Sequence, residues 1–105
     1  MVASAGTTDT GAVDPIEEIA GIAERHGLWL HLDAAYGGFF LLCDEGRRQL
    51  DGIERADSIV MDPHKGLGIP YGSGAVLVRR GRLLAESFSY YADYMQDAKR
   101  PGYDP

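Results

Sequence analysis

Two side chains with complementary chemistry follow two apolar segments of this 105-residue chain. Asp33 directly follows the apolar segment 28–32, and Lys65 comes shortly after the apolar segment 58–61. Binding groups of open α/β sheets collect at strand ends, so we expect the carboxylate and the amine to lie close together. An amine forms a Schiff base with an aldehyde, and a nearby carboxylate keeps a pyridine nitrogen protonated. Pyridoxal phosphate is the cofactor that uses this pair.

The residues around this pair form recognisable blocks. His-Leu-Asp-Ala-Ala-Tyr-Gly-Gly occupies residues 31–38, and Asp-Pro-His-Lys occupies residues 62–65. Together they resemble the core of the group II pyridoxal-phosphate-dependent amino-acid decarboxylases, the family of aromatic-amino-acid, glutamate, histidine and tyrosine decarboxylases. Residues 5–8 and 11–15 fit the segment that precedes the aspartate strand in that family. The three blocks stand in the same order and spacing over most of the chain, which makes the resemblance specific.

The resemblance implies an α/β fold: part of the large domain of a fold-type I, aspartate-aminotransferase-like enzyme, with a mostly parallel sheet covered by helices. Enzymes of this family are several times longer. We therefore expect residues 1–105 to be an internal fragment of the cofactor-binding large domain, without its N-terminal part and without the C-terminal small domain. The family's phosphate-binding serine and ring-stacking histidine belong to an upstream region, so the isolated fragment is expected to hold cofactor poorly and to be inactive.

The resemblance also implies roles for individual residues. Lys65 would be the Schiff-base lysine, Asp33 the partner of the pyridinium nitrogen, and Ala35 a contact of the cofactor ring. His64 would lie near the cofactor phosphate or the Schiff base, and the alternative is a histidine that only shapes the loop. Thr7 would donate a hydrogen bond to Asp33, or else would satisfy the backbone of its own loop.

Three further positions complete the expected site. Tyr94 matches a family tyrosine on a flexible loop that protonates the α-carbon after carbon dioxide has left, and residues 89–105 would form this mobile catalytic segment. A simple aromatic contact is the alternative for Tyr94. Asp62 stands where several relatives carry an asparagine near the phosphate, so we expect its carboxylate to turn away or to accept a backbone hydrogen bond. Strand alternation places His31 on the face of Asp33, and we interpret His31 as a core histidine.

Apolar segments separated by glycine-rich turns predict strands and helices in alternation, the pattern of a mostly parallel sheet covered by helices. Asp14 is the expected N-cap of the first helix, with Pro15 at its first position and Gly27 as its left-handed C-cap. The second strand is apolar enough for burial on both faces apart from His31. The predicted strands are residues 2–5, 29–32, 58–61 and 74–78, the last two joined by a hairpin-like connection, and the predicted helical segments are 15–26, turns within 45–55, and 82–87.

Composition argues against several classes of partner. The net charge of −6 and the absence of any run of Lys or Arg argue against nucleic acid and anionic membrane. No apolar stretch reaches the roughly 18 residues of a membrane span, and no secretory signal pattern opens the sequence, so a cytoplasmic location is the default. The single cysteine, Cys43, excludes an internal disulfide and a cysteine-based zinc site, and the three scattered histidines indicate no metal site.

The function that the resemblance implies for the intact protein is the decarboxylation of an L-amino acid to its amine, in a homodimer. An aminotransferase or aldolase of the same fold is one alternative, because those enzymes share the aspartate and the lysine. A non-catalytic truncated piece is the other. Aromatic residues near the expected site favour a bulky substrate only weakly; they are Tyr36, Phe39 and Phe40.

Overall fold

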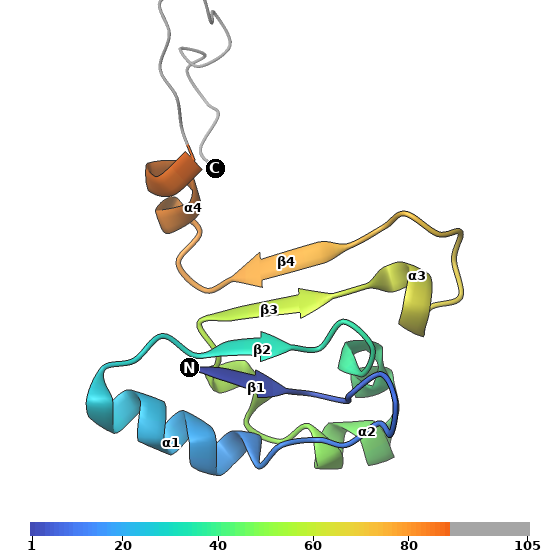
Figure 1. The fold of residues 1–105 in the computed structure, drawn as a ribbon, viewed down its shortest axis with the longest axis horizontal. Coiled ribbons are helices and arrows are strands. Elements are labelled where there is room, and N and C mark those ends of the chain that lie inside the picture. Colours follow the sequence, from blue (N-terminus) through green and yellow to red (C-terminus); the bar gives the residue numbers. More distant parts are fainter. Residues whose placement is uncertain (89–105) are drawn as a thin grey trace, which may run out of the picture.

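The computed structural model describes residues 1–88 as a four-stranded sheet with its helices mainly on one face (Figure 1). Helices and strands alternate along most of the chain, as the sequence predicts. In chain order the elements are β1 (Val2–Ser4), α1 (Ile16–His26), β2 (His31–Asp33), the 3-10 helix η1 (Gly38–Leu42), α2 (Asp44–Gln49), the 3-10 helix η2 (Ile53–Arg55), β3 (Ser58–Met61), α3 (Pro63–Gly66), β4 (Ala75–Val78) and α4 (Arg82–Phe88).

The sheet has the strand order β1-β2-β3-β4. Strands β1, β2 and β3 are parallel, with Ser4 opposite Asp33 and Asp33 opposite Val60. Strand β4 returns antiparallel to β3, as expected for the hairpin-like connection. The predicted mostly parallel α/β sheet is therefore confirmed, and the carboxyl ends of three strands lie at the same edge.

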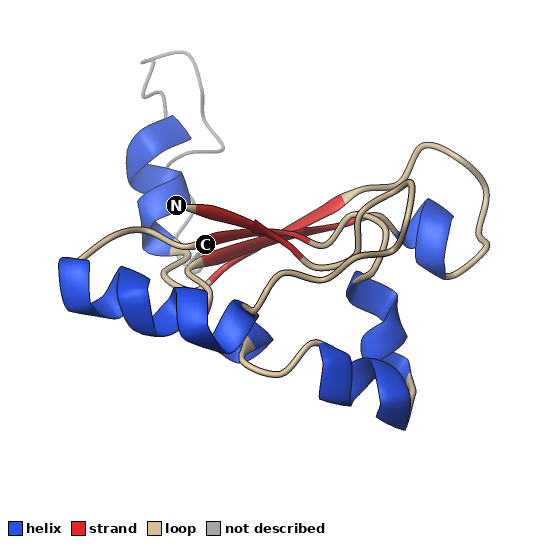
Figure 2. Ribbon diagram, turned by 60° about the horizontal axis from the view of Figure 1, so that its bottom comes forward, coloured by secondary structure: helices blue, strands red, loops and turns tan. Residues whose placement is uncertain are grey.

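The core lies between the sheet and helix α1. Strand alternation sends Leu30, Leu32 and Ala34 to this side, and all three are buried. Helix α1 contributes a buried stripe at helical spacing, with Ile16 and Ala20 among its members. Figure 2 shows α1 and α2 on the same side of the sheet. The opposite side of β2 carries His31 and Asp33, so the expected site residue does not lie in the core.

The start of α1 differs from the prediction, whereas its end agrees. The helix begins at Ile16 with Pro15 as its N-cap, and Asp14 does not cap it. The carboxylate of Asp14 instead accepts a hydrogen bond from the backbone N–H of Ser4 at 2.7 Å, because the 5–13 loop brings the chain back beside β1. At the other end Gly27 has φ of 61°, the left-handed conformation expected of a C-cap.

Strand β2 is shorter than predicted and less buried at its start. It begins at His31, and Trp29 before it is 39% exposed. The indole N–H of Trp29 donates to Ser58 Oγ at 2.9 Å, and His31 Nδ1 lies 2.8 Å from the same hydroxyl oxygen. The expectation of burial on both faces is therefore wrong at Trp29, because the indole lies on the face that α1 does not cover. His31 makes the hydrogen bond expected of a satisfied histidine, but it is only half-buried and lies on the face opposite the core, so its interpretation as a core histidine is wrong.

The turn before β3 is tied to α1 by one arginine. Arg55 forms ion pairs with Glu17 at 2.7 Å and with Glu24 at 2.6 Å. Leu50 and Ile53, from the helical turns between β2 and β3, are buried against the same core. These contacts fix the position at which β3 begins. They therefore also fix the position of its other end and of the residues that follow it. Within residues 1–88 no helix is both long and apolar enough to cross a membrane.

Candidate active site

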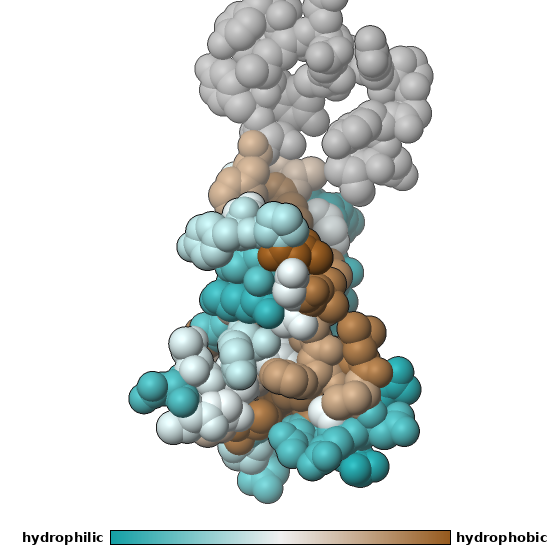
Figure 3. Space-filling model, turned by 90° about the vertical axis from the view of Figure 1, so that its right-hand side faces the viewer, coloured by the Kyte–Doolittle hydropathy of each residue, from teal (hydrophilic) through white to brown (hydrophobic). Residues whose placement is uncertain are grey.

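The carboxyl ends of β1, β2 and β3 meet at one edge of the sheet, at the right of Figure 1. Asp33 is the last residue of β2, and Lys65 lies in α3, the short helix that follows β3. Figure 3 looks toward this edge and shows hydrophobic and hydrophilic surfaces side by side. A surface of this mixed kind suits a ligand with both an aromatic ring and charged groups.

Hydrogen bonds hold both the backbone and the side chain of Asp33. Its backbone carbonyl accepts the N–H of Ala5 from the β1 side at 2.8 Å, and its Oδ1 accepts the N–H of Ala35 at 3.2 Å. Its Oδ2 has no hydrogen-bond partner among residues 1–88, and the side chain is exposed. One carboxylate oxygen is thus fixed and the other is available to a ligand.

Lys65 is placed by the packing of α3 against η1. Pro63 stands at the first turn of α3, where its missing N–H costs no hydrogen bond. Gly66 faces Phe39 so closely that a Cβ on Gly66 would lie 2.7 Å from the Phe39 Cβ. Only a glycine lets this helix approach the ring, and the approach brings Lys65 to the sheet edge.

Lys65 forms an ion pair that the sequence interpretation missed. Its Nζ lies 2.8 Å from Asp62 Oδ2, where we had expected Asp62 to turn away or to accept a backbone hydrogen bond. The pair forms because the turn of α3 brings the two side chains together at a spacing of three residues. The hydrogen bond to Asp62 raises the pKa of Lys65 above its usual value, with smaller Coulombic contributions from Asp62, Asp33 and Tyr71 and an opposing effect of burial.

Asp33 and Lys65 lie on the same side of the sheet edge. Asp33 stands opposite Val60, and Asp62 continues β3 in extended conformation two residues further, so strand alternation sends Asp33 and Asp62 to one face. Lys65 is paired with Asp62 on that face. The carboxylate of Asp33 is near enough to be one of the charges that raise the pKa of Lys65. The structure therefore brings the two residues together, as the strand-end argument requires.

His64 points into the loop before β4. Its Nδ1 is hydrogen-bonded to the backbone carbonyl of Ser73, and its ring lies 4.5 Å from that of Tyr71 between centroids. Because a carbonyl only accepts, Nδ1 carries the proton, and the Nε2 of a neutral imidazole is then an acceptor. Ser73 Oγ beside it is buried without a partner among the described residues. These contacts shape the loop and leave Nε2 for any ligand role.

Of the other predicted residues, Thr7 does not make the expected contact. Its Oγ1 accepts the N–H of Ala12 at 3.0 Å and lies 3.0 Å from Thr10 Oγ1, so within residues 1–88 it satisfies its own loop rather than Asp33. Ala35, two residues beyond Asp33, is half-buried, and its expected contact with the cofactor ring stays a prediction. Tyr94 and the segment 89–105 lie outside the described residues.

A close backbone approach supports the end of β2. Gly37 packs so tightly against β1 that a Cβ there would lie 2.0 Å from the carbonyl oxygen of Ala5 and 3.0 Å from the Cα of Gly6. Gly6 itself has φ of 99°, a conformation that favours glycine. The two glycines let the chain fold back beside Asp33 without moving Ala5.

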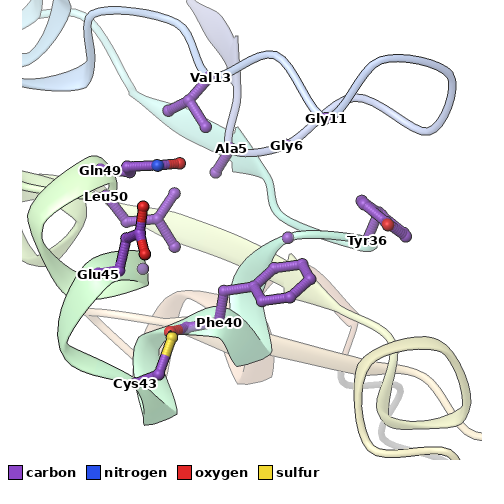
Figure 4. A pocket seen from close by; sticks show the side chains of 12 residues that line it. Ala5, Gly6, Gly11, Val13, Tyr36, Phe40, Cys43, Glu45, Gln49 and Leu50 are labelled. Carbon is purple, nitrogen blue, oxygen red and sulfur yellow. The ribbon is translucent and has the colours of Figure 1, made fainter.

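A pocket of about 300 Å³ lies on the helical side and does not include Asp33 or Lys65 (Figure 4). The rings of Tyr36 and Phe40, 5.9 Å apart, stand at its mouth. Two of the three aromatic residues that favour a bulky substrate, Tyr36 and Phe40, therefore line this pocket. The lining residues are Ala5, Gly6, Gly11, Val13, Tyr36, Gly37, Phe40, Cys43, Glu45, Gly46, Gln49 and Leu50.

The donor set at the edge is suited to an organic ligand. It holds one amine, two carboxylates and an imidazole, and no group of three metal-ligating side chains occurs within residues 1–88. An amine that can bond an aldehyde, beside a carboxylate with a free oxygen, fits pyridoxal phosphate.

Comparison with known proteins agrees with this chemistry. A family model described as the pyridoxal-dependent decarboxylase conserved domain matches residues 1–104. The chain belongs to this family. The predicted family and the pyridoxal cofactor that defines it are thereby confirmed.

Relatives named as amino-acid decarboxylases share much of this sequence. An aromatic-L-amino-acid decarboxylase of Bacillus atrophaeus is 41% identical over 99 residues, and an acidic amino acid decarboxylase of Mus musculus is 48% identical over 96 residues. These matches cover 94% and 90% of this chain but 21% and 18% of the relatives. The chain thus spans about a fifth of their length.

Solved structures confirm the fold-type I assignment. The crystal structure of mouse CSAD matches with a TM-score of 0.84 at 42% identity, over 98% of this chain and 21% of that one. The crystal structure of Oryza sativa TDC with PLP and tryptamine also matches with a TM-score of 0.84, at 37% identity, over 95% of this chain and 21% of that one. The sheet of this decarboxylase-family chain is therefore the sheet of those enzymes.

Proposed function

We propose that the intact protein decarboxylates an L-amino acid to its amine, with pyridoxal phosphate attached to Lys65 and with Asp33 at the pyridine nitrogen. The observation that carries the proposal is that Lys65 and Asp33 lie on one face of the same sheet edge. Family membership and the decarboxylase names of the relatives support the reaction class.

Each residue has a role that follows from its geometry. When bound, pyridoxal phosphate supplies an electron-withdrawing ring that accepts the electron pair left on the α-carbon as carbon dioxide departs. The free Oδ2 of Asp33 would accept a hydrogen bond from the protonated ring nitrogen, while the N–H of Ala35 keeps the other oxygen in place. Lys65 would bind the aldehyde carbon and later displace the product amine.

The remaining predicted residues have supporting roles in this proposal. His64 would offer Nε2 to the cofactor, since Nδ1 is committed to Ser73. Ala35 would border the ring, because its side chain is small and half-buried. Thr7 would act only through the 7–12 loop. Tyr94 would protonate the α-carbon in the closed site, and replacing it with Phe should then slow product formation more than substrate binding.

The decisive experiment is to load the intact protein with pyridoxal phosphate, reduce it with borohydride and map the labelled peptide. We expect a phosphopyridoxyl group on Lys65 and none in the Lys65→Ala variant. Measured carbon dioxide release with each amino acid then separates decarboxylation from transamination, which yields a keto acid instead. A label on another lysine, or keto acid without carbon dioxide, would contradict the proposal.

We propose further that the intact protein is a homodimer in the cytoplasm and that residues 1–105 alone are inactive. Exposed aromatic and aliphatic side chains beside the site support a need for further contacts; among them are Phe40, Leu42 and Tyr71. The exposed carboxylate of Asp33 at the open sheet edge also supports inactivity of the piece. Light scattering of the intact protein tests the dimer, and carbon dioxide release by the 105-residue chain tests the inactivity.

A further inference from the structure

We propose that Asp62 is a positioning residue whose carboxylate holds the Lys65 ammonium group at the sheet edge until the cofactor is attached. The inference rests on the proposed function of Lys65 and adds a second residue, Asp62, that determines where the amine of Lys65 lies. Nothing in the roles of Asp33 or His64 requires it.

The geometry of Asp62 is fixed by backbone contacts on both sides. Its N–H donates to the carbonyl of Ala35 at 3.2 Å, and its carbonyl accepts the N–H groups of Lys65 and Gly66 at 2.9 and 3.3 Å. The Asp62 carboxylate therefore stays beside α3. Its 2.8 Å contact with Lys65 Nζ is made within the single helical turn of α3. Asp62 is 18% exposed and Lys65 38%, so water screens this pair only in part.

The charges around Lys65 all favour its protonated form. Asp62 contacts the amine directly, and Asp33 and the hydroxyl of Tyr71 act from neighbouring elements. The adjacent His64 is committed to Ser73. A lysine is already an ammonium ion at neutral pH, and because this environment raises the pKa of Lys65, the amine gives up its proton less readily.

A protonated amine has no electron pair to attack an aldehyde. The bond between Nζ and the aldehyde carbon forms only after Nζ has given a proton to solvent, and the carbonyl oxygen then leaves as water. The Asp62 carboxylate also repels an approaching phosphate dianion. Asp62 therefore keeps the resting lysine oriented but makes cofactor attachment slower at neutral pH and faster as the pH rises.

The test is the substitution Asp62→Asn in the intact, cofactor-free protein. Asparagine keeps the size of the side chain and suits the residue before a helix equally well, so α3 should persist. Lys65 is labelled with limiting acetic anhydride across a pH series and quantified by peptide mass spectrometry. We expect labelling of Lys65 at neutral pH to rise about two- to fivefold, the range for losing a part-exposed ion pair.

Two matched variants isolate the cause. Asp51→Asn removes the same charge from an exposed position that is not among the groups acting on Lys65, and it should leave the labelling unchanged. Asp62→Glu retains a carboxylate, so labelling of Lys65 in this variant should stay close to that of the parent protein. Pyridoxal phosphate should also attach faster to Asp62→Asn than to the parent protein or to either matched variant. Only in Asp62→Asn should the pH profile of the attachment rate move to lower pH.

The outcomes separate this inference from the proposed function. If Asp62→Asn and the parent protein give the same Lys65 labelling profile, the inference is overturned even when borohydride still marks Lys65. If borohydride marks another residue, the proposed function fails, while the acetic anhydride profile still decides whether Asp62 holds Lys65.

Discussion

Replacing Gly37 with alanine tests whether the end of β2 is as tightly built as the structure shows. A Cβ at this position would lie 2.0 Å from the Ala5 carbonyl oxygen and 2.9 Å from its carbon. Both are backbone atoms, so no side-chain rotation relieves the clash. Gly37 has φ of −86° and ψ of −15°, which alanine adopts without strain, so the whole cost is steric.

The clash must be relieved by moving either the Gly37 turn or the end of β1. Moving β1 stretches the 2.8 Å hydrogen bond from the Ala5 N–H to the Asp33 carbonyl. Overpacking of well-packed sites costs about 1–3 kcal/mol, and a contact with rigid backbone belongs at or above about 3 kcal/mol. The expected result is a lower urea midpoint for Gly37→Ala in the intact protein, together with weaker pyridoxal phosphate binding because Asp33 is displaced.

Gly21→Ala is the matched control for this experiment. Gly21 lies inside α1, where an added Cβ would meet only the ends of two flexible side chains, Arg25 at 3.4 Å and Arg55 at 3.9 Å. Alanine there should stabilise the protein by about 1 kcal/mol, through helix propensity. Equal urea midpoints for the two variants would refute the argument that the Gly37 approach supports Asp33.

Two further predictions concern stability. Leu32 has 0% of its surface exposed, so Leu32→Ala should lower the free energy of unfolding by about 2–5 kcal/mol. Glu18→Ala, on the exposed face of α1, should change that free energy by about 0.5 kcal/mol or less. Urea titration measures both values. The hydrogen bond from Arg55 lowers the pKa of Glu24 from 4.5, so this pair stabilises the fold above that pH and its contribution is lost as the pH falls through the lower folded value. Arg55→Gln should therefore reduce the difference in urea midpoint between neutral and acidic solution, and an unchanged difference would contradict the assignment.

Much of the fold could be predicted because its cause is local. Short apolar segments ending in turn residues predict strands, and the predicted 58–61 matches Ser58–Met61 of β3. Gly27 was recognisable as a C-cap because few other residues adopt its positive φ. The position of Asp33 at the end of β2 and of Lys65 shortly after β3 followed from the same local pattern.

The errors occurred where a distant segment decides the local structure. Asp14 has the chemistry of an N-cap, but the neighbouring β1 offers the Ser4 N–H as a competing partner. Trp29 is apolar, yet its indole lies on the side without helix α1 and turns to Ser58. The contacts of Thr7 likewise depend on how the 7–12 loop closes. None of these partners is apparent from the sequence near the residue itself.

The Asp62–Lys65 pair belongs to a different class, because its spacing was visible in the sequence. Residues three apart face each other only if they lie on a helical turn, and the pattern around Pro63 had been interpreted as a strand end followed by a loop. A proline three residues before a glycine is compatible with a single helical turn, with proline at its first position. Interpreting the segment as a turn would have predicted the ion pair.

The two reactive residues differ in how firmly the fold holds them. Asp33 belongs to a strand that is hydrogen-bonded on both sides, by β1 and by β3, so its backbone has little freedom. Lys65 lies on one helical turn beyond β3, supported by Phe39 through Gly66 and by the loop contact of His64. Segments with fewer supporting contacts yield first. Adjustment to a bound cofactor should therefore occur at α3, where exchange of the Asp62 partner allows the amine to move while Asp33 stays in place.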